Sequence, residues 1–128
     1  MAEYKSGIVA QVGEYIVQQT QTEPGGGGVL AAELIYFGAI RIYGVVIDNS
    51  LNTDISYLRC WDRTGAPTIG TDVPHMILKS DAGTKVQYNF DRGVYFGSGI
   101  MSAVVTTAGT AGATAPAGTM SVSYLLGA

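Results

Sequence analysis

The chain has 128 residues, enough for one domain of ordinary size with a real hydrophobic core. Hydrophobic residues make up 47% of it but charged residues only 13%, about half of the usual globular share of roughly 25%. The formal net charge of −3 disfavours nucleic acid or an anionic membrane as a partner. So few charges favour burial of much of the surface against other subunits, with a poorly charged Gly-rich monomer as the alternative.

The amino-terminal region predicts one strand followed by a hinge. Residues 14–22 (EYIVQQTQT) are typical of an extended strand. Residues 23–28 (EPGGGG) predict a flexible linker, because glycine runs sample backbone space freely. Six linker residues reach at most about 20 Å, so the strand can be delivered to the edge of a neighbouring sheet. We therefore expect Tyr15 and Val17 to lie at a subunit interface.

The next segment is the most apolar of the chain. Residues 29–37 (VLAAELIYF) are ambiguous between a strand and a helical turn, whereas 39–49 predict a strand. The most apolar window, residues 29–47, contains Glu33, Arg41 and two glycines. A membrane-spanning helix needs about 20 apolar residues with almost no charge. We expect no membrane span, and no signal peptide after Met1.

A second strand is expected at residues 55–62, after a turn at 50–54. Successive strand side chains point to opposite faces, so this strand has an apolar inner pair and an outer row whose residue types are enriched at interface hot spots. The inner pair is Leu58 and Cys60, and the outer row is Tyr57, Arg59 and Trp61. We expect the outer row to form a subunit interface. The alternative places Trp61 in the core of a two-sided sheet, with Arg59 paired locally.

The rest of the chain predicts short strands separated by turns. Residues 63–73 form a loop, and strands follow at 74–80, 85–90, 94–96, 99–105 and 120–126, with a turn at Asp91–Gly93 between the second and third of them. This pattern predicts an all-β fold, with a jelly-roll-like β-sandwich of about eight antiparallel strands as the leading candidate. The expected organisation is an N-terminal arm and Gly-rich linker at 1–28 and a β-sandwich domain at 29–128.

The connection between the last two strands is long and chemically plain. Residues 106–119 (TTAGTAGATAPAGT) contain no charge, no aromatic ring and no large aliphatic side chain. Loops of more than about 12 residues without structure of their own tend to be functional or disordered. We expect a rim loop that contacts a neighbour through backbone and methyl groups, with a mobile tip as the alternative.

No motif for catalysis emerges from the sequence. His75 is the sole histidine, no serine lies in a G-x-S-x-G elbow, and GGGG at 25–28 lacks the Lys-Ser/Thr of a phosphate loop. The run DNSLNTD (48–54) has the oxygen spacing of a calcium loop but not its glycine and glutamate, so a turn is the favoured interpretation. Cys60 is the sole cysteine and allows no internal disulfide. We expect no enzyme activity, no cofactor and no metal.

Five segments, in chain order from Tyr43 onward, carry a resemblance. They are GVVIDNS, SYLRCWD, APTIGTDVP, GVYFGSGI and TTAGTAGATAP, and the region that they span is about two-thirds of the chain. It resembles small β-rich proteins encoded among tailed-phage structural genes, which are similar to the jelly-roll decoration (cement) proteins of capsids. None of the five is a catalytic motif, so the resemblance concerns a scaffold and its loops.

The resemblance implies a virion structural protein, made in the host cytoplasm, that stabilises a capsid through subunit contacts. It implies a homo-oligomer, with a trimer favoured, and the major capsid protein or another virion protein as partner. Two alternatives remain open. One is a tail or fibre component with the same fold, and the other is a carbohydrate-binding β-sandwich module that exposes Tyr57 and Trp61 as a platform.

Overall fold

The computed structural model describes the backbone of residues 15–21 and, in full, residues 30–128. This part of the chain contains strands, turns and loops but no helix, and accordingly holds no helix that could cross a membrane. The strands are β1 (Tyr15–Gln21), β2 (Glu33–Phe37), β3 (Ile40–Asp48), β4 (Ser56–Asp62), β5 (Met76–Ser80), β6 (Lys85–Phe96), β7 (Gly99–Val105) and β8 (Met120–Gly127). The all-β prediction is confirmed for the described residues.

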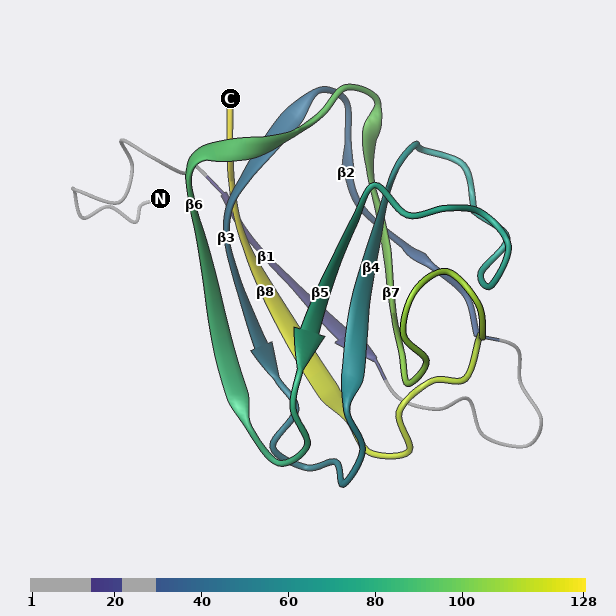
Figure 1. Cartoon of the computed structure of the whole chain (residues 1–128). Coiled ribbons are helices and arrows are strands. Elements are labelled where there is room, and N and C mark those ends of the chain that lie inside the picture. Colours follow the sequence, from purple (N-terminus) through teal and green to yellow (C-terminus); the bar gives the residue numbers. More distant parts are fainter. Residues whose placement is uncertain (1–14, 22–29) are drawn as a thin grey trace.

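The strands form two antiparallel sheets (Figure 1). The first sheet has the order β1-β8-β3-β6 and the second sheet the order β2-β7-β4-β5. Strands far apart in the sequence are therefore neighbours, since β1 pairs with β8, β2 with β7 and β3 with β6. β4 pairs with β5, and β3 and β4 each have a second partner, β8 and β7 respectively.

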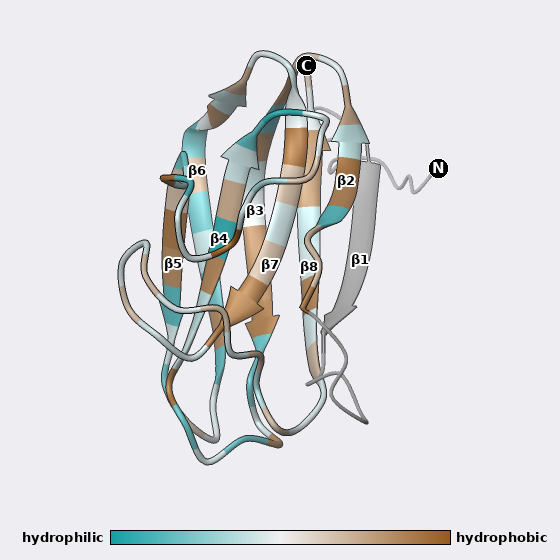
Figure 2. Cartoon of the chain, turned by 90° about the vertical axis from the view of Figure 1, so that its right-hand side faces the viewer, coloured by the Kyte–Doolittle hydropathy of each residue, from teal (hydrophilic) through white to brown (hydrophobic). Residues whose placement is uncertain are grey.

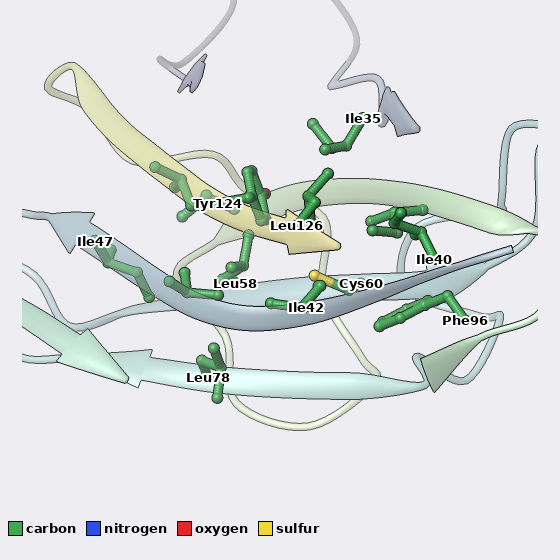
Figure 3. Packing of buried hydrophobic residues seen from close by; sticks show 14 of the residues in the cluster. Ile35, Ile40, Ile42, Ile47, Leu58, Cys60, Leu78, Phe96, Tyr124 and Leu126 are labelled. Carbon is green, nitrogen blue, oxygen red and sulfur yellow. The ribbon is translucent and has the colours of Figure 1, made fainter. Parts of the chain in front are cut away.

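The hydrophobic core lies between the two sheets. Alternate side chains of β3 and β8, such as Ile42, Tyr124 and Leu126, meet Leu58 and Cys60 of β4 (Figure 3). This is the arrangement that period-two alternation produces when one face of each sheet is buried. The hydroxyl of Tyr124 lies 2.8 Å from the Ser102 hydroxyl in the buried interior.

The expected turn at residues 91–93 is wrong, because the chain does not reverse there. β6 continues as one strand from Lys85 to Phe96. The register against β3 shifts between Ile42 and Gly44, so that several β6 residues lie opposite one β3 residue. Gly93 has a φ of +72° at this bulge, and an added Cβ there would lie 2.9 Å from the Arg41 Cβ. The turn-forming residues therefore bend a strand rather than end it.

The ambiguous segment at 29–37 contains strand β2 and no helical turn in its described part. The strand predicted at 14–22 is present as β1, which pairs along seven positions with β8 of its own chain. Residues 1–14 and 22–29 lie outside the described residues, so the division between an arm and a domain at residue 28 stays a prediction.

Candidate interaction surface

The predicted alternation in β4 is confirmed, but the predicted exposure of its outer row is not. Leu58 and Cys60 belong to the core between the sheets. Trp61 belongs to a second apolar cluster, on the other side of the sheet. Arg59 is fully buried and Trp61 is 2% exposed, while Tyr57 is half-buried. This matches the alternative in which the outer row is covered.

The chain's own loops cover Trp61. Its indole Nε1 donates a hydrogen bond of 2.9 Å to the carbonyl of Asp72, in the loop between β4 and β5. The ring packs in a cluster with Met101 and Ala103 of β7, against which Ala32 and Ile69 also lie. Figure 2 looks onto this side of the second sheet, with the loops after β4 and β7 on the viewer's side. Trp61 is therefore not an open platform for a sugar.

Arg59 is held by the long loop after β7. Its Nη1 donates to the carbonyl of Gly112 at 2.8 Å, and its Nη2 donates to the carbonyls of Thr107, at 2.8 Å, and of Ala111. The Nε atom is buried without a hydrogen-bond partner. Burial lowers the pKa of the guanidinium from its usual value, although arginine stays charged at neutral pH.

These contacts explain the plain composition of residues 106–119. The loop folds back on itself, with the amide of Thr106 donating to the carbonyl of Thr114 at 3.0 Å. Gly112 has a φ of +83°, and an added Cβ would lie 2.5 Å from the Thr107 Oγ1. Small residues let the loop come close enough for its carbonyls to surround a guanidinium. In the described structure the loop is therefore bound to its own sheet rather than free.

The two predicted interface residues of the arm lie on β1. By register, Tyr15 is opposite Leu126 and Val17 is opposite Tyr124 of β8. β1 is an edge strand of the first sheet. Its partner in this structure is a strand of the same chain, so the proposed addition to a neighbour's sheet stays a prediction.

Seven large apolar residues of the described part of the chain are exposed, and three of the most exposed lie near the ends of β2, β4 and β6. Phe37 is 75%, Val73 77% and Tyr95 52% exposed. Phe37 precedes the β2–β3 connection, where the Gly38 amide donates to the Ser98 carbonyl at 2.9 Å. We call these three residues the strand-end surface, because Phe37 ends β2, Tyr95 is next to last in β6, and Val73 lines a hollow together with Asp62, the last residue of β4.

Asp62 fixes the turn in the middle of the strand-end surface. Its carboxylate accepts hydrogen bonds from the amides of Gly97 at 3.0 Å, Ser98 at 2.8 Å and Gly99 at 3.4 Å. Burial alone raises the pKa of this carboxyl, but the three amides together with His75 hold it below its ordinary value. The β6–β7 turn that supports Tyr95 is thereby clamped to β4.

A polar hollow of about 440 Å³ adjoins the strand-end surface. Its lining includes Asp62, Val73, His75 and an ion pair of 3.0 Å between Arg63 and Asp72. The Nε2 of His75 lies 2.9 Å from the Tyr95 carbonyl, and its ring meets Phe96 edge-on, with the centroids 4.7 Å apart. These contacts give His75 a structural role at this end of the molecule.

The 48–54 segment forms a turn. Asp48 accepts hydrogen bonds from the hydroxyl and the amide of Ser50, at 2.6 and 3.1 Å, and these bonds lower the pKa of its carboxyl. The side-chain Nδ2 of the buried Asn49 donates to the Asp54, Ser80 and Asp81 carbonyls. Within residues 15–21 and 30–128, no group of three or more His, Cys, Asp or Glu side chains is arranged to hold a metal ion.

The outer face of the first sheet is different from that of the second. A shallow hollow of about 230 Å³ lies where Gly44 leaves space between β3, β6 and β8. Only strand residues line it, among them Val46, Gln87 and Leu125, and none of these is charged. The two sides of the molecule thus differ, because loops cover one sheet and form no part of this hollow on the other.

The sequence interpretation missed the strand-end surface. Val73 falls in a predicted loop and Phe37 directly precedes Gly38, and large apolar residues beside turns are the signal that would have indicated exposure. No family model matches the chain, and no curated protein or solved structure matches it either.

Proposed function

We propose that the chain is a jelly-roll-like β-sandwich. The support is the nested pairing of β1 with β8, β2 with β7, β3 with β6 and β4 with β5. A hairpin-like ribbon of eight strands that is wrapped into two sheets produces this order, and it is the arrangement that defines jelly rolls. The core between the sheets, formed by residues from both of them, is consistent with the sandwich.

We propose further that the protein is a structural component of a tailed-phage virion, a decoration or cement protein of the capsid. The observation that carries this proposal is the strand-end surface, in which Phe37, Val73 and Tyr95 expose more than half of their side chains. Exposed apolar side chains that gather in one patch are typical of protein–protein contacts, and the proposal takes these three to form such a patch. The low charge and the resemblance from Tyr43 onward point in the same direction.

The mechanism is passive. The protein buries apolar surface across subunit boundaries, which contributes roughly 25 cal/mol per Å² before the costs of association are subtracted. Stable pairs commonly bury about 1,600 Å², an area larger than three side chains supply. The proposal therefore includes a homo-oligomer, with a trimer favoured, and contact with the major capsid protein over a wider surface. The protein is made in the host cytoplasm and acts on the virion.

The experiment that tests the proposal locates the protein on the particle. Virions of the phage that encodes this chain are purified on a density gradient, probed by mass spectrometry and labelled with gold-conjugated antibodies against the chain. Label on the head at many sites per particle supports the decoration protein. Label confined to the tail replaces it with the tail or fibre alternative, and absence from intact virions overturns the virion proposal altogether.

A further inference from the structure

The loops that cover the second sheet are in contact with each other. The backbone of Gly70, in the β4–β5 loop, lies against that of Gly112, since an added Cβ on Gly70 would be 3.3 Å from the Gly112 carbonyl oxygen. Gly70 has a φ of +95°, so both the backbone conformation and the close approach require glycine. The two loops, 63–75 and 106–119, therefore form one continuous cover.

Two side chains of β4 attach this cover to the sheet. Trp61 donates to the Asp72 carbonyl of the first loop, and Arg59 donates to three carbonyls of the second loop. They lie two residues apart on the same outer face. In the described structure, the hydrogen bonds that tie residues 107–112 to the sheet come from Arg59. Loss of Arg59 thus removes the attachment of residues 107–112, while the end of the same loop keeps the buried Ala115 and the hydrogen bond of 2.6 Å from the Gly118 amide to the Asn52 side chain.

The cost of burying the Arg59 charge is only partly offset by its hydrogen bonds. The side chain is fully buried, yet its acceptors are neutral carbonyls and its Nε has no partner. Burial of a charge is costly unless it is paired with an opposite charge and fully hydrogen-bonded. Residues 107–114 add little apolar burial of their own, since most of them are exposed. We therefore expect the closed cover to be held less firmly than the core between the sheets.

We propose that loops 63–75 and 106–119 form a single latched cover, that Arg59 is its latch, and that the cover opens as a unit while the two sheets stay folded. Such partial opening is the behaviour expected of segments with few buried apolar contacts. Opening uncovers Arg59, Trp61 and Met101. The inference concerns the chain alone and does not depend on the proposed function.

Hydrogen exchange of the intact protein under native conditions tests whether the two loops open together while the sheets stay folded. The hydrogen-bonded amides of the two loops, those of Thr71, Asp72 and Thr106, are expected to exchange at similar rates with a weak dependence on denaturant, because the opening exposes less surface than unfolding of the two sheets does. The amides of β3 and β8 are expected to exchange more slowly, with a strong dependence on denaturant. Loops that exchange only through the same opening as β3 and β8 overturn the proposal without any variant.

The latch is tested with Arg59→Met, which keeps most of the length and removes the charge. Loss of the charge-assisted bonds is expected to accelerate exchange of the Thr106 amide, which donates to the Thr114 carbonyl, by at least about tenfold. Trp61 is the sole tryptophan, so its fluorescence should shift to the red and become more accessible to acrylamide. Exchange in β3 and β8 should stay slow.

The matched control is Arg63→Met, which removes an arginine from the same region but breaks only the exposed pair with Asp72. It should leave exchange of the Thr106 amide unchanged. Arg59→Lys keeps the charge but has a single ammonium, and it should fall between wild type and Arg59→Met. Equal exchange in wild type and Arg59→Met, or equal acceleration by both methionine variants, overturns the role of Arg59.

Discussion

β4 has only seven residues, yet its neighbouring side chains make very different kinds of contact. Cys60 packs in the core, where burial raises the pKa of its thiol. Arg59 on the opposite face depends on loop carbonyls. Asp62, at the end of the strand, depends on turn amides. Each requirement is met by a segment distant in the sequence, so single substitutions in β4 should be felt in particular loops.

The clamp by Asp62 predicts a dependence of stability on pH. The folded-state pKa of Asp62 lies below its ordinary value, so its contribution is present above the unfolded pKa, about 3.9, and is lost as pH falls through the folded pKa. Asp62→Asn should cost about 1 kcal/mol near pH 7. Urea unfolding at several pH values should show the variant and wild type converging in strong acid.

The control for this prediction is Asp91→Asn, on an exposed aspartate of β6. It removes the same charge at the same end of the molecule without touching the β6–β7 turn. A pH-independent difference for Asp62→Asn, or an equal effect of Asp91→Asn, would show that the amide contacts do not stabilise the fold.

At the scale of elements, the conformation of the 106–119 loop depends on Gly112 in particular. Gly112 and Gly109 both have positive φ values, +83° and +73°. An added Cβ meets Thr107 at Gly112 but has nothing within 4 Å at Gly109. A comparison of alanine substitutions at these two glycines therefore distinguishes the effect of steric contact from that of backbone strain. The strain costs roughly 1–2 kcal/mol at either position.

Gly112→Ala is expected to move the carbonyls that Arg59 binds, whereas Gly109→Ala is expected to leave them in place. The measurement is the protection of loop amides together with acrylamide quenching of Trp61. Both variants should lose stability in thermal unfolding, but only Gly112→Ala should increase quenching. Identical quenching in the two variants would contradict the close packing of Gly112 on Thr107.

β1 is the element for which the sequence and the structure point to different partners. A strand beyond a glycine-rich linker predicted an arm for a neighbour, whereas β1 pairs with β8 of its own chain. Deletion of residues 1–28 leaves the β8 edge unpaired, and unpaired edges favour association. The unfolding midpoint should fall by at least about 5 °C, with aggregation visible by light scattering.

Deletion of residues 1–14 alone is the control, because it keeps β1. An unchanged midpoint after the longer deletion would mean that β1 does not stabilise its own sheet. It would favour the prediction that β1 adds to the sheet of a neighbouring subunit. A loss of oligomer without any loss of stability would favour that same conclusion.

Strand positions were largely predictable because alternation and turn residues report local preferences. The continuation of β6 through residues 91–93 was not, since a turn and a bulge use the same residues and only the pairing with β3 distinguishes them. The sequence predicted which β4 side chains face away from the core between the sheets, but it did not predict that Arg59 and Trp61 are buried on that outer face. Whether Trp61 faces solvent is decided by the loops at 63–75 and 106–119, whose paths depend on tertiary contacts.

At the scale of the whole molecule, the strand-end surface is the surface that we propose contacts a partner. Phe37 is 75% exposed, so Phe37→Ser should leave the fold intact. Truncation of a central apolar contact commonly weakens binding by tenfold or more. Sedimentation with capsids stripped of the native protein should show that loss, as should light scattering if the surface joins copies of the chain.

Leu51→Ser is the matched control, because Leu51 is 74% exposed and lies at the opposite end of β3. Equal loss of binding in the two variants would indicate general stickiness rather than a defined surface. Normal binding by Phe37→Ser would remove the strand-end surface from the proposal.

The central place of β8 has a consequence for the order in which the protein is built. β8 lies between β1 and β3, so a ribosome that has completed β1 and β3 has made two strands of a sheet without the strand that joins them. β3 and β6 can pair before then, as can β4 and β5, but β1 cannot join the first sheet until residues 120–127 are made. Such long-range pairing is slow, on the order of milliseconds to seconds. During synthesis, the half-made sheet is exposed to other copies and to chaperones.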